Sequence, residues 1–177
     1  SEVEKVLEDN KRSIDRLEEE LRKVTRTSRE LLKEWAKRLE DVLRDVKRAV
    51  DELETRGVDE KTLRELRKRL TDIEREIRKK LEEAEKKLRE SERDVEDTLR
   101  RLREKSRRIT EEARKGGDSD EIRKLKEELK RLDEEAARIL ETIMRRNKDL
   151  NDRLREIIET LKKRLKDLLK EVEDRAR

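Results

Sequence analysis

The sequence predicts an elongated all-α protein, an antiparallel up-down-up bundle of three helices with a shallow left-handed supercoil. Apolar residues that recur at helical spacing indicate helices that bury one face. Three such stripes run from Val3 to Leu53, from Leu63 to Ala113 and from Ile122 to Val172. The three glycines of the chain lie in two places between the stripes, and most other residues are charged.

The three stripes are evenly matched in length and spacing. Each has fifteen positions over a span of 50 residues, an average step of about 3.57 residues. This step is slightly below the period of a straight α-helix, which favours a weak left-handed supercoil. At about 1.5 Å of rise per residue, each stripe would extend over roughly 75 Å.

The composition agrees with long helices. Charged residues make up 59% of the chain and apolar residues 29%, and proline, cysteine and histidine are absent. Low apolar content is also typical of disordered chains, but the regular phasing of the apolar residues argues against disorder. The 54 basic and 50 acidic residues are interleaved, which indicates solvated helix faces rather than a one-sided basic surface.

The first helix is expected at residues 2–56, with Ser1 and Glu4 as a capping box at its start. Gly57 can take the left-handed conformation that closes a helix. Asp59 can then cap a second helix at residues 59–115, and Val58 and Leu63 stand at the positions of a hydrophobic staple.

The second connection contains Gly116 and Gly117, followed by Asp118 and Ser119, either of which can cap a third helix at residues 119–176. Because both connections are short, neighbouring helices should be antiparallel. We therefore expect one domain over residues 1–177, with the handedness of the three-helix turn left open.

Six polar residues interrupt the stripes. Five of them form the candidate polar core: Asn10, Ser106, Ser28, Ser91 and Asn147. Counted by layers from one end of the bundle, Asn10 and Ser106 share a height. Ser28 and Asn147 share another, with Ser91 one layer away. Because an unpaired amide in an apolar core costs about 1–3 kcal/mol, these groups are expected to hydrogen-bond to one another and to set the helix register.

Other polar residues lie beside or within these layers. Ser13 and Thr110 could extend the first cluster, and Thr25 and Asn151 the second. Thr98 stands alone in its stripe and is expected to bond to a carbonyl of its own helix.

Trp35 is expected to fill the core beside Leu81 and Ala84. Further apolar residues lie next to the stripes and should widen them toward both neighbouring helices, unless they form a second seam for dimerisation or for an added helix: Val6, Leu43, Val50, Leu99, Met144, Ile158 and Leu169.

No catalytic, metal or cofactor site is expected. Nucleophilic arrangements that depend on histidine or cysteine are impossible without those residues. The stripes contain no carboxylate for a metal site in the bundle core, and the three glycines form no phosphate-binding loop. The pairs of carboxylates elsewhere lie on solvated faces, where nothing raises a pKa or excludes water.

The matched stripes, the Gly-Val-Asp and Gly-Gly-Asp-Ser connections and the layered Asn and Ser residues resemble de novo designed helical bundles with parametric backbones and buried hydrogen-bond networks. The resemblance covers the whole chain. It implies a hyperstable scaffold with no natural substrate, cofactor or compartment, and it carries over no functional residue.

A natural alternative is a spectrin-type spacer or a rod that binds other proteins through its helices. A bundle that binds membranes or nucleic acid would need a one-sided basic face, and none is apparent in the sequence. We therefore expect a soluble monomer that requires no partner, with a homo-oligomer or a designed partner helix left open. The N-terminus lacks the apolar region of a signal peptide, and the sequence indicates no compartment.

Overall fold

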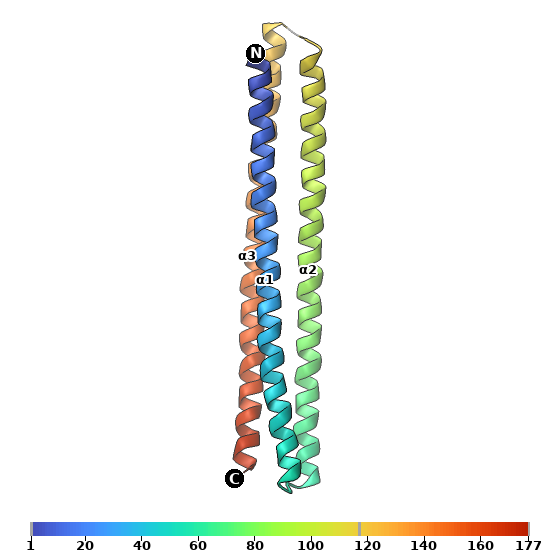
Figure 1. Ribbon diagram of the computed structural model, residues 1–177, viewed down its shortest axis with the longest axis vertical. Helices are drawn as coiled ribbons and strands as arrows, with labels where there is room; N and C mark the ends of the chain where they lie inside the picture. Colours follow the sequence, from blue (N-terminus) through green and yellow to red (C-terminus); the bar gives the residue numbers. More distant parts are fainter. Residues whose placement is uncertain (1, 117, 177) are drawn as a thin grey trace. The chain divides into compact units, whose positions relative to one another are not determined.

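The computed structural model describes residues 2–116 and 118–176 and has three helices, α1 (Glu2–Thr55), α2 (Glu60–Arg114) and α3 (Ser119–Arg175) (Figure 1). The protein is an all-α three-helix bundle, and each pair of helices is in contact. The observed helix ends differ from the expected ones by no more than one residue. Strong helix formers and the absence of proline explain why the helices run without interruption.

The connection between α1 and α2 ends one helix and caps the next. Gly57 has a φ angle of 78°, and the N–H of Val58 donates to the carbonyl of Leu53 at 3.2 Å, so α1 closes with the expected left-handed glycine. The N–H of Thr62 donates to Oδ1 of Asp59 at 2.8 Å, which confirms Asp59 as the cap of α2.

The connection between α2 and α3 follows the same logic. Gly116 has a φ angle of 90°. Of the two candidate caps, Asp118 is the one used, because its Oδ1 accepts the N–H groups of Asp120 and Glu121 at 3.1 and 3.0 Å. Ser1, to which the capping box at the start of α1 was assigned, and Gly117 lie outside the described residues.

The chain divides into two compact units, each of which contains a segment of all three helices. The first unit comprises Ser1–Thr27 and Leu88–Lys148, and the second comprises Ser28–Lys87 and Asp149–Arg177. A side chain on a long helix contacts only residues at a similar position along the helix axis. The contacts between helices therefore form separate groups along the chain. The expectation of a single domain stays a prediction.

The first unit has a continuous apolar core to which all three helices contribute. Its buried members are Ile14, Leu17, Leu21, Val95, Leu99, Leu102, Leu132, Ala136 and Ile143. Ion pairs between helices show that α2 runs opposite to its neighbours. It pairs with α1 through Arg22–Glu96 and Asp15–Arg103, and with α3 through Lys105–Glu135 and Arg146–Asp94. The Lys126–Glu2 pair joins α3 to α1, and both of these residues lie near the start of their helix.

The second unit is built in the same way. Its most deeply buried apolar side chains, each with at most 2% of its surface exposed, are Leu39, Val46, Val50, Leu53, Leu66, Leu161, Leu165, Leu168 and Val172. Lys47 pairs with Glu74 at 3.0 Å and Arg67 with Glu54 at 2.7 Å, so α1 and α2 are antiparallel here as well.

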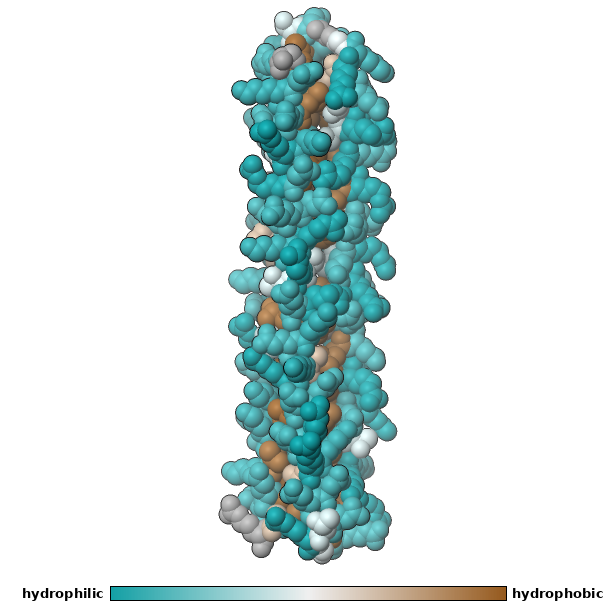
Figure 2. Space-filling view, viewed as in Figure 1, coloured by the Kyte–Doolittle hydropathy of each residue, from teal (hydrophilic) through white to brown (hydrophobic). Residues whose placement is uncertain are grey.

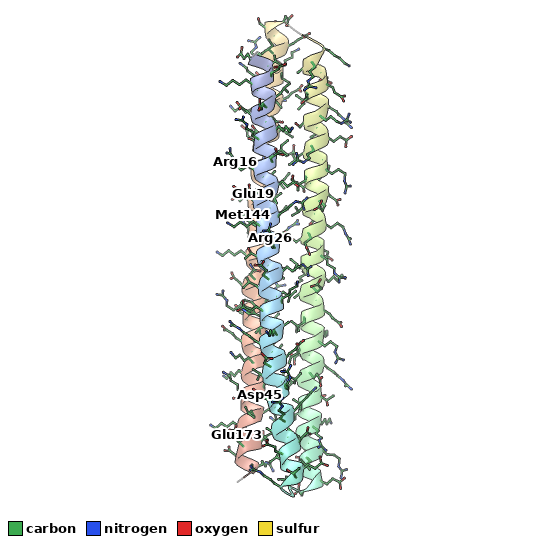
Figure 3. All side chains as sticks on the ribbon, viewed as in Figure 1. Arg16, Glu19, Arg26, Asp45, Met144 and Glu173 are labelled. Atoms are coloured by element: carbon green, nitrogen blue, oxygen red, sulfur yellow. The ribbon has the colours of Figure 1, made fainter. Side chains whose placement is uncertain are left out.

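The apolar stripes occupy the interior, as expected, because every stripe position on the three helices is buried or half-buried. Among the residues expected to widen the stripes, Val50, Leu99 and Ile158 are buried. Met144 contradicts the expectation, since 48% of its surface is exposed (Figure 3). It follows the core residue Ile143 and is therefore turned about 100° away from it, to a side of α3 that stays open.

Charged side chains cover most of the surface, with apolar residues visible between them (Figure 2). Several of these charges pair along one helix at a spacing of four residues, as in Glu8–Arg12 and Glu34–Arg38. Such pairs stabilise a helix by about 0.2–0.5 kcal/mol each. Across residues 2–116 and 118–176, none of the helices carries an apolar stretch sufficient to cross a membrane.

Candidate functional site

Asn10 connects all three helices of the first unit. Its side chain is 3% exposed, and its Oδ1 accepts a hydrogen bond from Oγ of Ser106 on α2 at 2.7 Å. Its Nδ2 donates to Oδ1 of Asp133 on α3 at 3.3 Å. The expected pairing of Asn10 with Ser106 is therefore confirmed.

Asp133 is the member of this cluster that sequence reasoning missed. It carries a charge and lies one position after the stripe residue Leu132, so its pattern is that of a solvent-facing residue. One feature of the sequence could have indicated this contact. A residue next to a stripe lies at the edge of the interface between helices, and Asp133 has a short carboxylate at about the height of Asn10.

The carboxyl of Asp133 has a raised pKa. The residue as a whole is exposed, but the carboxyl loses water where it faces the helix interface. This desolvation raises the pKa, and the hydrogen bond from Asn10 opposes the effect only in part. The carboxylate can therefore accept the Asn10 amide while it keeps contact with solvent.

Ser91 and Asn147 form a second pair within the first unit. Nδ2 of Asn147 donates to Oγ of Ser91 and to the carbonyl of Ile143, both at 2.9 Å. Asn147 is 2% exposed and Ser91 is 8% exposed. The expected pairing across α2 and α3 is confirmed, and the bond to Ile143 adds a contact with the preceding turn of α3.

Ser28 belongs to the second unit and is 2% exposed. Its expected meeting with Ser91 and Asn147 would join residues of the two units and stays a prediction. Asn151, also in the second unit, is half-buried, and its Oδ1 is buried without a hydrogen-bond partner.

The residues expected to extend the clusters do not do so through their side chains. The hydroxyl of Thr25 donates to the carbonyls of Leu21 and Arg22, and that of Thr110 to the carbonyl of Ser106. Ser13 is exposed. A hydroxyl in a helix reaches the carbonyl three or four residues earlier more easily than a group on another helix, so local bonds replace the expected network.

Trp35 is half-buried on α1 in the second unit. The guanidinium of Arg155 on α3 lies 5.8 Å from the centre of the indole ring. At this distance a cation is attracted by the ring face. The ring therefore contributes to the α1–α3 contact. Its expected packing beside Leu81 and Ala84 stays a prediction.

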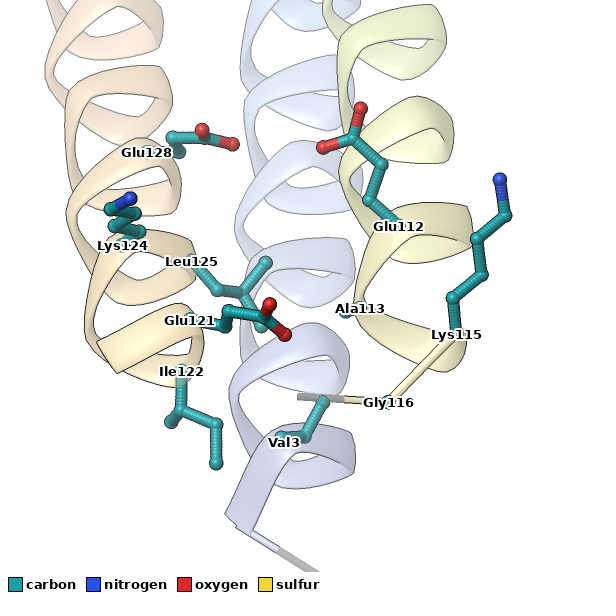
Figure 4. Close-up of a pocket in the computed structure, with 10 residues that line it drawn as sticks. All are labelled: Val3, Glu112, Ala113, Lys115, Gly116, Glu121, Ile122, Lys124, Leu125 and Glu128. Atoms are coloured by element: carbon teal, nitrogen blue, oxygen red, sulfur yellow. The ribbon is translucent and has the colours of Figure 1, made fainter. Parts of the chain in front are cut away.

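Two cavities of the first unit are candidates for ligand sites. One, of about 670 Å³, lies near the connection between α2 and α3 and has apolar walls from Val3, Ile122 and Leu125 (Figure 4). The other, of about 790 Å³, lies between α2 and α3. The described part of the chain contains no group of three or more acidic residues placed to hold a metal ion.

No family model, no curated protein and no solved structure matches this chain. Its function therefore has to be inferred from its own residues.

Proposed function

We propose that this chain is a de novo designed helical-bundle scaffold without a natural biochemical activity, in which buried polar side chains select the register of the helices. The observation that carries the proposal is the bonding of Asn10 to Ser106 and Asp133, which ties α1 to both neighbours. A small set of directional bonds in an apolar core is a known way to specify helix pairing.

The energetic argument concerns the alternatives to the observed alignment. If one helix shifted by two turns, Asn10 or Asn147 would face leucines and lose its hydrogen-bond partners. A buried polar group that loses its partner costs about 1–3 kcal/mol. The polar pairs therefore disfavour shifted alignments that the apolar stripes alone would tolerate, because successive layers of a stripe are similar to one another.

Replacing both asparagines by leucine tests this role. In the Asn10→Leu, Asn147→Leu variant we expect an equal or higher melting temperature, because leucine suits an apolar core, together with a less uniform helix register. The chain has no cysteine, so spin labels at Lys11→Cys on α1 and Arg108→Cys on α2 report the register through one distance distribution.

A matched control is Asn151→Leu, since Oδ1 of Asn151 has no partner to lose. We expect this control to keep the narrow distance distribution of the parent chain, while the double variant broadens it or gains a second peak. An equally narrow, unshifted distribution in the double variant, with unchanged oligomeric state, would mean that the polar pairs do not select the register.

A scaffold of this kind requires no partner. The mixture of ion pairs on all three helices supports this part of the proposal, because opposite charges near one another weaken any long-range attraction to a charged surface. We expect no salt-dependent binding to anionic vesicles or to duplex DNA. Binding that weakens steeply with added salt would instead favour a membrane- or nucleic-acid-binding bundle.

A further inference from the structure

A groove of about 790 Å³ between α2 and α3 of the first unit is not explained by the scaffold role. Its lining includes Thr98 and Arg101 from α2 and Arg138, Ile139 and Ile143 from α3. None of these residues belongs to the polar core. The volume lies within the range of about 300–1,000 Å³ that is typical of small-molecule sites.

Thr98 is the unusual residue of this groove. It is only 5% exposed, and within the described part of the chain it has no hydrogen-bond partner, contrary to the expected bond to its own helix. Six other threonines do bond to a carbonyl of their own helix: Thr25, Thr27, Thr55, Thr110, Thr142 and Thr160. The Thr98 hydroxyl is thus a donor without a partner on a nearly buried residue that lines the groove.

Two arginines of the groove have no ion-pair partner among the described residues. Each acid of the lining is paired with a cation, in the pairs Asp94–Arg146 at 2.8 Å, Asp97–Arg100 at 3.3 Å and Glu135–Lys105 at 3.1 Å. The guanidinium groups of Arg101 and Arg138, one on each side of the groove, have no acidic partner among the residues that the structure describes.

We infer that this groove binds a small organic anion with an apolar body. The oxyanion lies between the guanidinium groups of Arg101 and Arg138 and accepts a hydrogen bond from the Thr98 hydroxyl. The apolar body lies on Ile139, a half-buried residue of the lining that packs against the core containing Ile143.

The chemistry of the groove suits this class of ligand. Guanidinium groups donate planar, charge-assisted hydrogen bonds to carboxylate, sulfonate or phosphate oxygens. The hydroxyl of Thr98 adds a third donor, and burial of the ligand's apolar body against Ile139 favours binding. A simple inorganic anion would gain only the first two contributions.

The test uses the full chain and the fluorescent probe 8-anilinonaphthalene-1-sulfonate, which has a sulfonate on an apolar ring system. We expect saturable binding at one site per chain. The Arg101→Gln, Arg138→Gln variant should weaken binding about tenfold or more, because losing charge-assisted bonds costs at least about 1.4 kcal/mol. Thr98→Val, which keeps the shape of the side chain, should weaken it by about threefold.

The control variant is Arg16→Gln, Arg26→Gln, which also removes two positive charges from the first unit, but from α1 and away from the groove residues (Figure 3). We expect its affinity to stay close to that of the parent chain. Circular dichroism of each variant establishes that the helices are intact, because this probe also binds partly folded states.

Three results would overturn the inference: no saturable binding to the folded parent chain, equal weakening in the two double variants, or equally tight binding of uncharged N-phenyl-1-naphthylamine. The groove shares no residue with the polar core, so any of these results leaves the scaffold proposal unaffected. The spin-label experiment on Asn10 and Asn147 tests that proposal separately.

Discussion

Glu18 shows how a single surface carboxylate can join two helices. Its Oε1 accepts a hydrogen bond from Nε of Arg22 on the same helix at 3.0 Å, and its Oε2 accepts one from Arg103 on α2. The bond from Arg103 and then that from Arg22 lower the pKa of Glu18, and each has a larger effect than the desolvation that raises it. The ionised form of Glu18 therefore stabilises the folded state.

The pH dependence of Glu18→Gln tests this coupling. A carboxyl with a lowered pKa in the folded state binds more protons when the chain is unfolded. Its contribution to the free energy of unfolding is therefore fully present above the pKa of the unfolded state, and it is lost as pH falls through the pKa of the folded state. We expect the variant to be less stable by about 0.5–1 kcal/mol at pH 7. The difference should shrink below pH ~4 in urea unfolding at a series of pH values.

Glu19→Gln is the matched control for that series (Figure 3). Glu19 is the next residue on α1 and is exposed, and the described part of the chain offers it no ion-pair partner. We expect this substitution to have little effect at any pH. A loss of stability in Glu18→Gln that stayed constant from pH 7 to pH 3 would contradict the assigned role of the carboxylate.

At the scale of the elements, the starts of α2 and α3 each depend on a single aspartate. The first N–H groups of a helix have no partner within the helix, and Asp118 accepts two of those of α3, from Asp120 and Glu121. Asp59 acts in the same way for α2 through Thr62. The helices α2 and α3, of 55 and 57 residues, thus each begin at a position set by one side chain.

Removal of the cap of α3 should be measurable. In Asp118→Ala we expect a loss of about 1 kcal/mol in the free energy of unfolding, because two helix N–H groups lose their acceptor. Asp118→Asn keeps a capping oxygen and should stay close to the parent chain. Urea unfolding compares the three proteins, and equal midpoints for all of them would show that the cap does not contribute.

At the scale of the whole molecule, stability should come from the apolar stripes. All three helices bury these stripes along their length, and strong helix formers occupy most of the exposed positions. Regular helices with capped starts and a consistent apolar face are typical of very stable bundles. Local propensity, capping and burial therefore favour the same structure.

Thermal unfolding provides the corresponding measurement. We expect the far-ultraviolet circular dichroism of the helices to persist to about 70 °C or higher, as in idealised bundles. Loss of helix below that temperature would indicate that the cores of the two units are less well packed than their burial suggests.

The oligomeric state tests whether the remaining apolar surface forms an interface. We expect a monomer with a mass of 21.6 kDa, since Met144 is the single large apolar side chain that is exposed among the described residues, and one such residue does not make a stable interface. Light scattering at several concentrations decides the matter. A mass of twice this value would refute the monomer and point to a second seam.

The sequence by itself determined the three helices, the capped starts of α2 and α3, and the faces that the helices bury. These features depend on the period of a helix and on side chains within a few residues, which are local properties. The pairings of Asn10 with Ser106 and of Asn147 with Ser91 were also predictable, because short connections between antiparallel helices leave little freedom in the alignment of equal stripes.

The tertiary structure decided which side of each helix its neighbours cover. A residue one position from a stripe is turned about 100° from it, and the chain gives no local signal of whether another helix lies there. This is why Asp133 bonds to Asn10 and why Met144 is open to solvent although Leu99 is buried. Thr98 is itself a stripe residue, and the groove that it lines likewise depends on where α3 lies beside α2. Those outcomes depend on the angular placement of the neighbouring helices, which the period of a single helix does not contain.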